Sequence, residues 1–306
     1  MGILDEISQQ IRQAADQVGN SVVGIGQRWG VGSGVVIGDG QVLTNAHNVR
    51  ADEVEVTFPD GHTATGQVVG HDIDGDVAVI GVDTGDLPAI SWTSDGAPTV
   101  GTPVFALANP GGRGLRVTLG FVTGVERSFH GPRGRRITGS IEHDAPLLPG
   151  SSGGPIVTAD GQLLGMNTHR LGEGFYLAIP ADEALRTQVD GLARGESKRR
   201  PRLGIGIAPA DVARRMRRAV GLPDAEGLLV RLVEDDSPAS RAGLETGDLI
   251  VQAAGRAVRH TDDLFEALEA AADGVISLKI LRGADERTVD VQLGAATGDP
   301  SDVQQA

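Results

Sequence analysis

Short apolar runs separated by turn residues dominate the chain from residue 21 to about residue 180. The run GSGVVIGDGQVLTNA holds two β-rich segments around Asp39 and Gly40, a dipeptide typical of a tight hairpin turn. Similar runs follow at fairly regular intervals, among them EVEVTF, VAVIGV, PVFALA and GPIVTADGQLLGMNT. Many short strands with turn signals between them predict an all-β barrel or sandwich for this part of the chain.

The period of the pattern changes after Pro180. In ADEALRTQVDGLARG the apolar residues from Ala184 to Leu192 share one side of a helix. The charged segment that follows leads us to interpret residues 195–201 as a linker between two domains. Residues 202–295 then mix strand-like runs such as GLLVRLV and VISLKIL with expected helices, which predicts a smaller α+β domain.

Three helices are expected in this second segment. One covers residues 211–220, one follows Ser237, and one begins after Thr261. Serine followed by proline, as at Ser237 and Pro238, is typical of a helix N-terminus. The polar tail, residues 296–306, is predicted to be disordered.

The first residues follow a pattern of their own. Apolar side chains at helical spacing predict a helix within residues 1–19 that packs on the main domain or on a partner chain. A membrane-surface helix is the less favoured alternative, because Arg12 is its only basic side chain. Asp5 and Glu6 interrupt the apolar run that a secretory signal needs, and no transmembrane stretch is visible. We therefore expect a cytoplasmic protein, or an extracytoplasmic one if the sequence is part of a longer chain.

Composition narrows the chemistry. The 306 residues carry a formal net charge of −14 and no cysteine, so disulfides, a catalytic thiol and zinc–thiolate sites are excluded. An acidic chain has no general electrostatic reason to bind nucleic acid. The alternation of Asp72, Asp74 and Asp76 suggests calcium ligands, but Gly75 lies inside the run and the required downstream glutamate is missing. We expect no metal and no cofactor.

The segment LLPGSSGGPIV raises the question of a nucleophilic serine at Ser151 or Ser152. Such a serine needs a base, a group that orients the base, and backbone N–H groups for the oxyanion. Among the seven histidines, His47 is favoured as the base because it follows a predicted strand and has small neighbours. His71 begins a carboxylate-rich segment, and the remaining five lie in polar or turn-like contexts and are expected to be solvated loop residues: His62, His130, His143, His169 and His260. Asp76 immediately precedes the apolar run VAVI, where a charge is costly unless it is paired. The alternative for His47 is an ordinary half-buried histidine.

The chain order histidine, aspartate, serine is that of the chymotrypsin triad, which occurs on a two-barrel all-β fold. The strand pattern independently predicts an all-β domain. Residue type, chain order and fold class therefore agree.

Several segments of the chain together resemble the HtrA (Deg) serine proteases. The resemblance rests on GSGVVIGDGQVLTNAHNV, DGDVAVIGV, HDAPLLPGSSGGPIVTADGQLLGMNT and the PDZ-like GLLVRLVEDDSPASRAGLETGDLIVQAAGRAV, and it spans about residues 20–295. It implies a chymotrypsin-like double six-stranded β-barrel protease domain over residues 20–194 and a PDZ domain over residues 202–295. It further implies ATP-independent cleavage of misfolded or unfolded proteins, capture of peptide C-termini by the PDZ domain, and a homotrimer.

The resemblance also selects residues for the reaction. It implies that Ser152 is the nucleophile, with Ser151 at the position where the family usually has Asn or Asp. It makes His47 the general base, Asp76 its orienting partner, and the N–H groups of Gly150 and Ser152 the oxyanion hole.

Specificity follows from the same resemblance. Pro146 and Leu147 are expected at the first specificity pocket, which predicts a preference for small or medium aliphatic side chains unless Asp144 turns inward. Thr168 falls where trypsin-like proteases place a hydroxyl near the triad aspartate. Residues 109–114 and 127–140 match positions where the family has activation and sensing loops; the alternative is an ordinary solvated loop.

For the PDZ domain, RLGIGI resembles the carboxylate-binding loop and the edge strand after it. The resemblance implies that backbone N–H groups of Leu203, Gly204 and Ile205 capture a peptide C-terminus, beside the helix that carries Leu264 and Leu268. The competing interpretation of the whole chain is a catalytically silent, protease-like scaffold or chaperone that binds peptides through its PDZ domain.

Overall fold

The computed structural model describes residues 2–26, 31–93, 96–132, 134–172, 174–196, 201–208, 210–271 and 274–293. The chain divides into two compact units at residues 198 and 199. Most of the expected linker, the expected tail, Trp29 and Arg133 lie outside the described residues.

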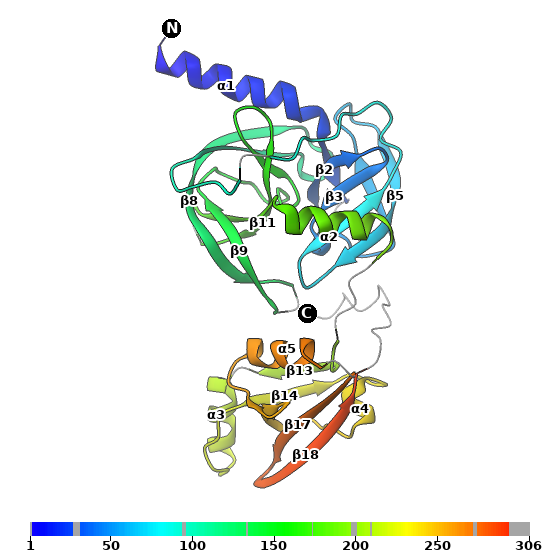
Figure 1. The fold of residues 1–306 in the computed structure, drawn as a ribbon, viewed down its shortest axis with the longest axis vertical. Helices are drawn as coiled ribbons and strands as arrows, with labels where there is room; N and C mark the ends of the chain where they lie inside the picture. The colour runs from blue at the N-terminus through cyan, green and yellow to red at the C-terminus, as the bar shows by residue number, and fades with distance from the viewer. Residues whose placement is uncertain are drawn as a thin grey trace. The chain divides into compact units, whose positions relative to one another are not determined.

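The first unit contains two closed barrels of six strands each, as expected (Figure 1). The strand order is β1-β2-β3-β6-β5-β4 in one barrel and β10-β11-β12-β9-β8-β7 in the other. The first barrel consists of β1 (Val22–Ile25), β2 (Gly32–Gly38), β3 (Gln41–Thr44), β4 (Glu53–Thr57), β5 (Thr63–Asp72) and β6 (Val77–Gly81). The second consists of β7 (Pro103–Ala108), β8 (Arg116–His130), β9 (Arg136–His143), β10 (Pro155–Val157), β11 (Leu163–Arg170) and β12 (Tyr176–Pro180).

Helical segments stand at the ends of the barrels and in two of their loops. They are α1 (Ile3–Val18), η1 (Gly19–Ser21), η2 (Ala46–Asn48), η3 (Pro110–Gly112) and α2 (Glu183–Ala193). The expected helices at both ends of this unit are therefore present. Asp182 is the N-cap of α2, and its side chain accepts a hydrogen bond from Leu185 N at 2.8 Å. Aspartate is one of the preferred residues at this position.

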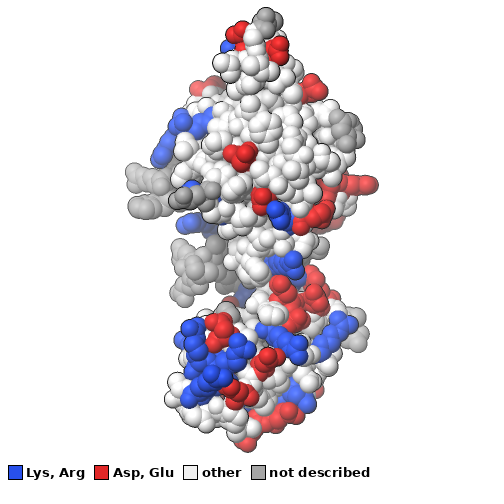
Figure 2. All heavy atoms as spheres, turned by 90° about the vertical axis from the view of Figure 1, so that its left-hand side faces the viewer, with Lys and Arg blue, Asp and Glu red and all other residues white. Residues whose placement is uncertain are grey.

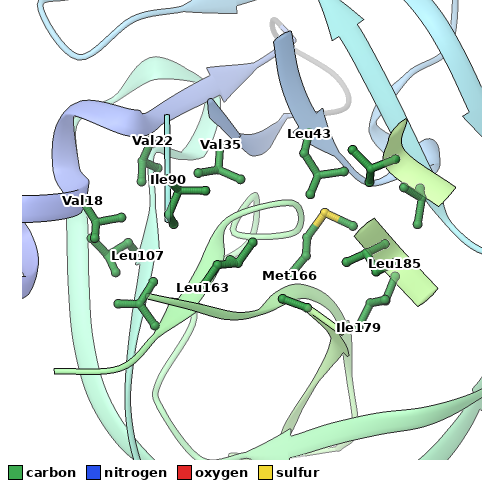
Figure 3. Packing of buried hydrophobic residues seen from close by; sticks show 14 of the residues in the cluster. Val18, Val22, Val35, Leu43, Ile90, Leu107, Leu163, Met166, Ile179 and Leu185 are labelled. Carbon is green, nitrogen blue, oxygen red and sulfur yellow. The ribbon is translucent and has the colours of Figure 1, made fainter. Parts of the chain in front are cut away.

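The largest apolar cluster lies between the two barrels, and we call it the inter-barrel core. Val35 and Leu43 of the first barrel face Leu163 and Met166 of the second, as Figure 3 shows. Helices α1 and α2 contribute to the same cluster through Ala14, Val18, Leu185, Val189 and Leu192. Each barrel also has an interior cluster of its own. Each Å² of apolar surface that these clusters remove from water stabilises the fold by about 25 cal/mol.

The second unit is a sheet in the order β13-β14-β15-β17-β18, with β16 paired to β15. Its elements are β13 (Ile205–Ala208), α3 (Ala210–Ala219), β14 (Leu228–Val233), α4 (Pro238–Arg241), β15 (Leu249–Ala253), β16 (Arg256–Ala257), α5 (Thr261–Glu269), β17 (Val275–Arg282) and β18 (Asp285–Gln292). Ser237 caps α4 by accepting from Ser240 N at 3.0 Å, as the Ser-Pro signal predicts.

Basic side chains of the second unit have acidic neighbours. Figure 2 shows both charges close together on the visible face of this unit. Three arginines of α3 take part in ion pairs, Arg214 with Glu226, Arg215 with Asp211 and Arg218 with Asp224. The basic run in α3 therefore forms a mixed-charge surface rather than a purely positive one.

Candidate active site

Asp76 occupies the turn between β5 and β6 in an uncommon backbone conformation. Its φ is 56°, in the left-handed region, and its side chain is buried. The carbonyl of Asp76 accepts a hydrogen bond from Asn45 Nδ2 at 3.0 Å. A non-glycine residue held this way costs on the order of 1–3 kcal/mol and is typical of functional sites. The turn aims the carboxylate of Asp76 at His47.

The carboxylate of Asp76 has three hydrogen-bond donors around it. Both of its oxygens lie 2.9 Å from His47 Nδ1, and Oδ1 also accepts from the backbone N of His47 at 3.1 Å. Thr168 Oγ1 donates to Oδ2 at 2.6 Å. Because a carboxylate only accepts, the proton of a neutral His47 ring lies on Nδ1. Nε2 is then the nitrogen that is able to accept a proton from a nucleophile.

Neighbouring elements fix the turn that carries Asp76. Asp72 accepts from Gly75 N at 3.0 Å and from Gln188 Nε2 of α2 at 2.9 Å. Arg135, at the tip of the β8–β9 hairpin, lies 3.6 Å from Asp74 through its Nε, and both side chains are largely buried. Among the described residues, no three His, Asp or Glu side chains are grouped to hold a metal ion.

Ser152 lies in the loop between β9 and β10, flanked by glycines with positive φ. Gly150 has φ 88° and Gly153 has φ 86°. The Ser152 hydroxyl donates to Thr168 O at 3.0 Å, and within the described part of the chain it makes no hydrogen bond with His47. A catalytic role would require the hydroxyl to leave Thr168 O and to donate to His47 Nε2 instead. Loose catalytic hydrogen bonds are common in structures without substrate.

Two backbone donors beside Ser152 are unused. Among the described residues, neither Gly150 N nor Ser152 N donates a hydrogen bond, whereas Ser151 N, Gly153 N and Gly154 N each have an acceptor. These are the two N–H groups that the family resemblance assigns to the oxyanion hole. They are therefore available to a developing oxyanion, which prefers such pre-oriented donors.

A cavity of about 110 Å³ opens beside Ser151. Its lining comprises Leu147, Leu148, Pro149, Ser151, Thr168, His169, Arg170 and Tyr176. Pro146, expected at the base of the pocket, is exposed and does not line it. Asp144 does not line it either, and its carboxylate accepts from Phe121 N at 2.6 Å. The walls are thus mainly apolar, with basic side chains at His169 and Arg170.

His143 is the last residue of β9 and is fully buried. The expectation that it is a solvated loop residue is wrong. Its Nε2 is 2.9 Å from Asn167 Oδ1, its Nδ1 has no partner among the described residues, and its ring stacks on Tyr176. Burial lowers the pKa of His143, against the smaller opposing effects of Asn167 and Asp144. The ring is therefore neutral near neutral pH.

In the second unit, β13 is the edge strand of the sheet. Within the described chain, Leu203 N and Gly204 N donate no hydrogen bond, while the carbonyls of the same two residues are used. Gly204 has φ 75°, and a Cβ there would lie 2.4 Å from Ser237 Cβ. The side chains of Leu264 and Leu268, expected at a peptide groove, belong to the core and are 3% exposed each.

Sequence reasoning missed the polar residues that support the site. Ser33, Asn45, Asn48 and Asn167 are all buried and bond to the loops that carry Asp76 or Ser152. One signal was present in the sequence: TNAHN surrounds His47 with polar side chains directly after an apolar strand. Buried polar groups need partners, so this cluster indicated a hydrogen-bond network.

The first unit has two barrels, with a hydrogen-bonded His–Asp pair in loops of the first barrel and a glycine-flanked serine in a loop of the second. These features define a trypsin-like peptidase fold, and a PDZ-type sheet follows it. Comparison with known proteins agrees, since residues 32–166 match the trypsin-like peptidase domain and residues 229–282 match the PDZ domain. A putative serine protease, HhoA, from Synechocystis sp. is 34% identical over 278 residues, which are 86% of this chain and 70% of the relative.

Other relatives point the same way. A probable periplasmic serine endoprotease, DegP-like, from Halomonas elongata is 34% identical over 276 residues, covering 88% of this chain and 57% of the relative. The structure of an HtrA-type protease, AlgW with a decapeptide, superposes with a TM-score of 0.65 at 25% identity and covers 94% of this chain and 99% of that one. A serine endoprotease from Yersinia pestis gives a TM-score of 0.62 at 27% identity, covering 92% and 97%. The chain belongs to the HtrA family of serine proteases.

The chain spans about three fifths of the length of the DegP-like relatives that it matches, at 57% and 60%. None of the helices in the described residues has the length and apolar character that crossing a membrane requires.

Proposed function

We propose that this chain is an ATP-independent serine endopeptidase that cleaves misfolded or unfolded proteins. The observation that carries the proposal is the hydrogen-bond chain from Thr168 through Asp76 to His47, which leaves Nε2 of His47 available to a nucleophile. Ser152, with two unused N–H donors beside it, supplies the nucleophile and the oxyanion hole. Family membership and the names of the relatives support the same activity.

The proposed reaction proceeds in two stages. Ser152 Oγ attacks the peptide carbonyl carbon while His47 Nε2 takes the hydroxyl proton, and Asp76 stabilises the imidazolium that forms. The carbonyl oxygen becomes an oxyanion that accepts from Gly150 N and Ser152 N. His47 then gives the proton to the leaving amine, and water releases the acyl group by the same steps in reverse. Each oxyanion donor contributes about 10²–10³-fold in kcat in related chemistry.

We propose that the cavity lined by Leu147 and Thr168 receives the side chain on the acyl side of the cleaved bond. A volume of about 110 Å³ suits a small or medium aliphatic side chain. Tyr176 supports this wall, because its hydroxyl donates to Leu147 O at 3.2 Å. Pro146 has no place in this pocket, so the preference rests on Leu147, Leu148 and Tyr176 instead.

The second unit is proposed to bind peptide C-termini. The unused N–H groups of Leu203 and Gly204 are the donors for a terminal carboxylate, and the peptide then adds to the edge strand β13. Ile205, the third residue of the expected loop, is the first residue of that strand. Peptides accompany solved relatives, as in AlgW with a decapeptide.

Activity-based labelling tests the nucleophile. A fluorophosphonate probe is expected to label the wild type and Ser151→Ala, but not Ser152→Ala. Unfolded casein should be digested by the same two proteins that are labelled. The competing hypothesis, a silent scaffold, predicts binding of casein without cleavage and no labelling of any variant, even with a C-terminal peptide present.

Two further points stay predictions. A homotrimer is expected from the family resemblance, and light scattering of the purified chain tests it. The cellular compartment, cytoplasmic or extracytoplasmic, also stays a prediction, and the DegP-like relatives are named periplasmic. Fractionation of cells that express the natural gene decides between the compartments.

A further inference from the structure

Ser33, at the start of β2, connects the first barrel to the loop that carries Ser152. It is fully buried. Its backbone N donates to Ser152 O at 2.8 Å, and its Oγ donates to Gly150 O at 2.9 Å. The same Oγ accepts from Asn109 N at 3.0 Å, and the carbonyl of Ser33 accepts from Thr44 Oγ1 at 2.7 Å. Every polar atom of this residue is thus engaged, and two of its bonds reach the nucleophile loop.

The contacts of Ser33 fall on alternate peptide units of that loop. The Gly150–Ser151 peptide is bound at both ends, by Ser33 Oγ at its carbonyl and by Leu148 O at its N–H. The Ser152–Gly153 peptide is likewise bound, by Ser33 N at its carbonyl and by Asn167 O at its N–H. The unused N–H of Ser152 belongs to the peptide between these two fixed planes. The unused N–H of Gly150 belongs to the peptide that precedes the first of them.

This alternation determines the direction of the free donors. The peptide that carries Ser152 N lies between two planes that hydrogen bonds fix. The peptide that carries Gly150 N adjoins the first of these planes through Gly150, whose φ of 88° a glycine adopts without strain. With Asn109 N donating to the Ser33 hydroxyl oxygen, the hydroxyl proton is directed at Gly150 O. Ser33 therefore fixes the two peptide planes that flank the free Ser152 N–H, and the first of these planes also adjoins the peptide of the free Gly150 N–H.

The loop approaches Ser33 closely. A Cβ on Gly153 would lie 2.0 Å from Ser33 O, so only glycine permits this distance. Asn48 adds a second support, since its Nδ2 donates to Ser152 O at 3.0 Å and to Thr44 Oγ1 at 3.0 Å. Asn48 does not contact the Gly150–Ser151 peptide in any described hydrogen bond, so the hydroxyl of Ser33 has no substitute there.

We propose that Ser33 is a positioning residue for the oxyanion hole, acting through the Gly150–Ser151 and Ser152–Gly153 peptides. The inference rests on the proposed peptidase function. It predicts an effect on the chemical step rather than on substrate binding, because the oxyanion exists only after attack. Misplacing reacting groups by about 1 Å costs about 10²-fold in rate, so we expect a loss of about 10–100-fold in kcat without the hydroxyl.

The experiment compares Ser33→Ala with Ser140→Ala. Ser140 is a matched control, because it is also fully buried and its hydroxyl has no partner among the described residues. The assay is steady-state hydrolysis of a chromogenic peptide with an aliphatic side chain at the cleaved bond. Ser33→Ala is expected to lower kcat about 10–100-fold with KM within about threefold, and to weaken inhibition by a peptide boronate in proportion to kcat/KM. Ser140→Ala should match the wild type.

Three outcomes overturn the inference: kcat of Ser33→Ala within about twofold of Ser140→Ala, a rise in KM alone, or unchanged boronate inhibition. If Ser33→Ala does not fold by circular dichroism, Ser33→Cys decides by the same criteria. A thiol keeps a polar atom at the same position but is a weak donor, and this chain has no other cysteine with which it can pair. If the wild type itself hydrolyses nothing and takes no fluorophosphonate, the proposed function fails rather than the role of Ser33.

Discussion

Replacing Thr168 with valine removes one hydrogen bond from the buried carboxylate of Asp76 and changes little else. The hydroxyl of Thr168 lies 2.6 Å from Asp76 Oδ2, and valine keeps the branched shape that the position holds. The carboxylate retains its contacts with His47, but Oδ2 then has only the shared Nδ1 as a donor. The substitution therefore tests whether the threonine hydroxyl orients the carboxylate.

The size of the effect follows from the charge of the acceptor. A hydrogen bond to a charged group contributes about 1.5–3 kcal/mol, so the free energy of unfolding of Thr168→Val should fall by about this amount. Part of the loss also appears in the transition state, where Asp76 faces an imidazolium. At about 1.4 kcal/mol per tenfold in rate, we expect kcat/KM to fall roughly tenfold.

Urea denaturation and peptide hydrolysis measure the two effects on the same protein. Thr168→Ser is the matched control, because it keeps the hydroxyl donor while losing the methyl group. If Thr168→Val keeps wild-type stability and kcat/KM, the hydroxyl does not orient Asp76. If Thr168→Ser loses as much as Thr168→Val, the methyl group rather than the hydrogen bond is responsible.

Three more substitutions, two of them paired with a control substitution, have defined outcomes. Because burial lowers the pKa of His143, the unfolded chain binds a proton below about pH 6.5 that the folded chain does not; the unfolding free energy should therefore fall as the pH drops through 6.5, and His143→Gln should reduce this slope in urea titrations. Gly153→Ala should abolish peptide hydrolysis, whereas Gly139→Ala should not. The two glycines have similar φ values, 86° and 80°, but only at Gly153 would a new Cβ meet backbone, the Ser33 carbonyl oxygen at 2.0 Å. Equal activities of the two variants would contradict the close approach. Gly204→Ala should weaken binding of a C-terminal peptide by calorimetry more than about tenfold, whereas Gly221→Ala, with φ 73° and open space, should bind normally.

The pattern of apolar runs along the sequence predicted most of the fold. Short apolar runs with turn residues between them predicted an all-β barrel or sandwich, and the change of period after Pro180 predicted α2. The barrels form because these runs bury one face or both, so the pattern itself contains the physical cause. Closure into two barrels came from the family resemblance, because pairing between distant strands leaves no local trace.

Side-chain direction was less predictable. His143 has polar neighbours in the sequence, HDAP, but its burial depends on Asn167, 24 residues further along the chain. Helical spacing showed that Leu264 and Leu268 share a face of α5, and packing directs that face into the core. The direction of the Ser152 hydroxyl depends on a side-chain torsion angle, which no sequence pattern specifies.

The inter-barrel core determines how short a fragment of the first unit can be while both barrels stay closed. The match to the trypsin-like peptidase domain covers residues 32–166, and it leaves out β1, β12 and both terminal helices of the unit. Yet Val18, Leu185 and Leu192 lie in the same apolar cluster that joins the two barrels. An expression fragment trimmed to the recognised domain would open two closed barrels and expose the surface between them. The fragment to express for enzymology or crystallisation therefore extends at least from Ile3 to Ala193.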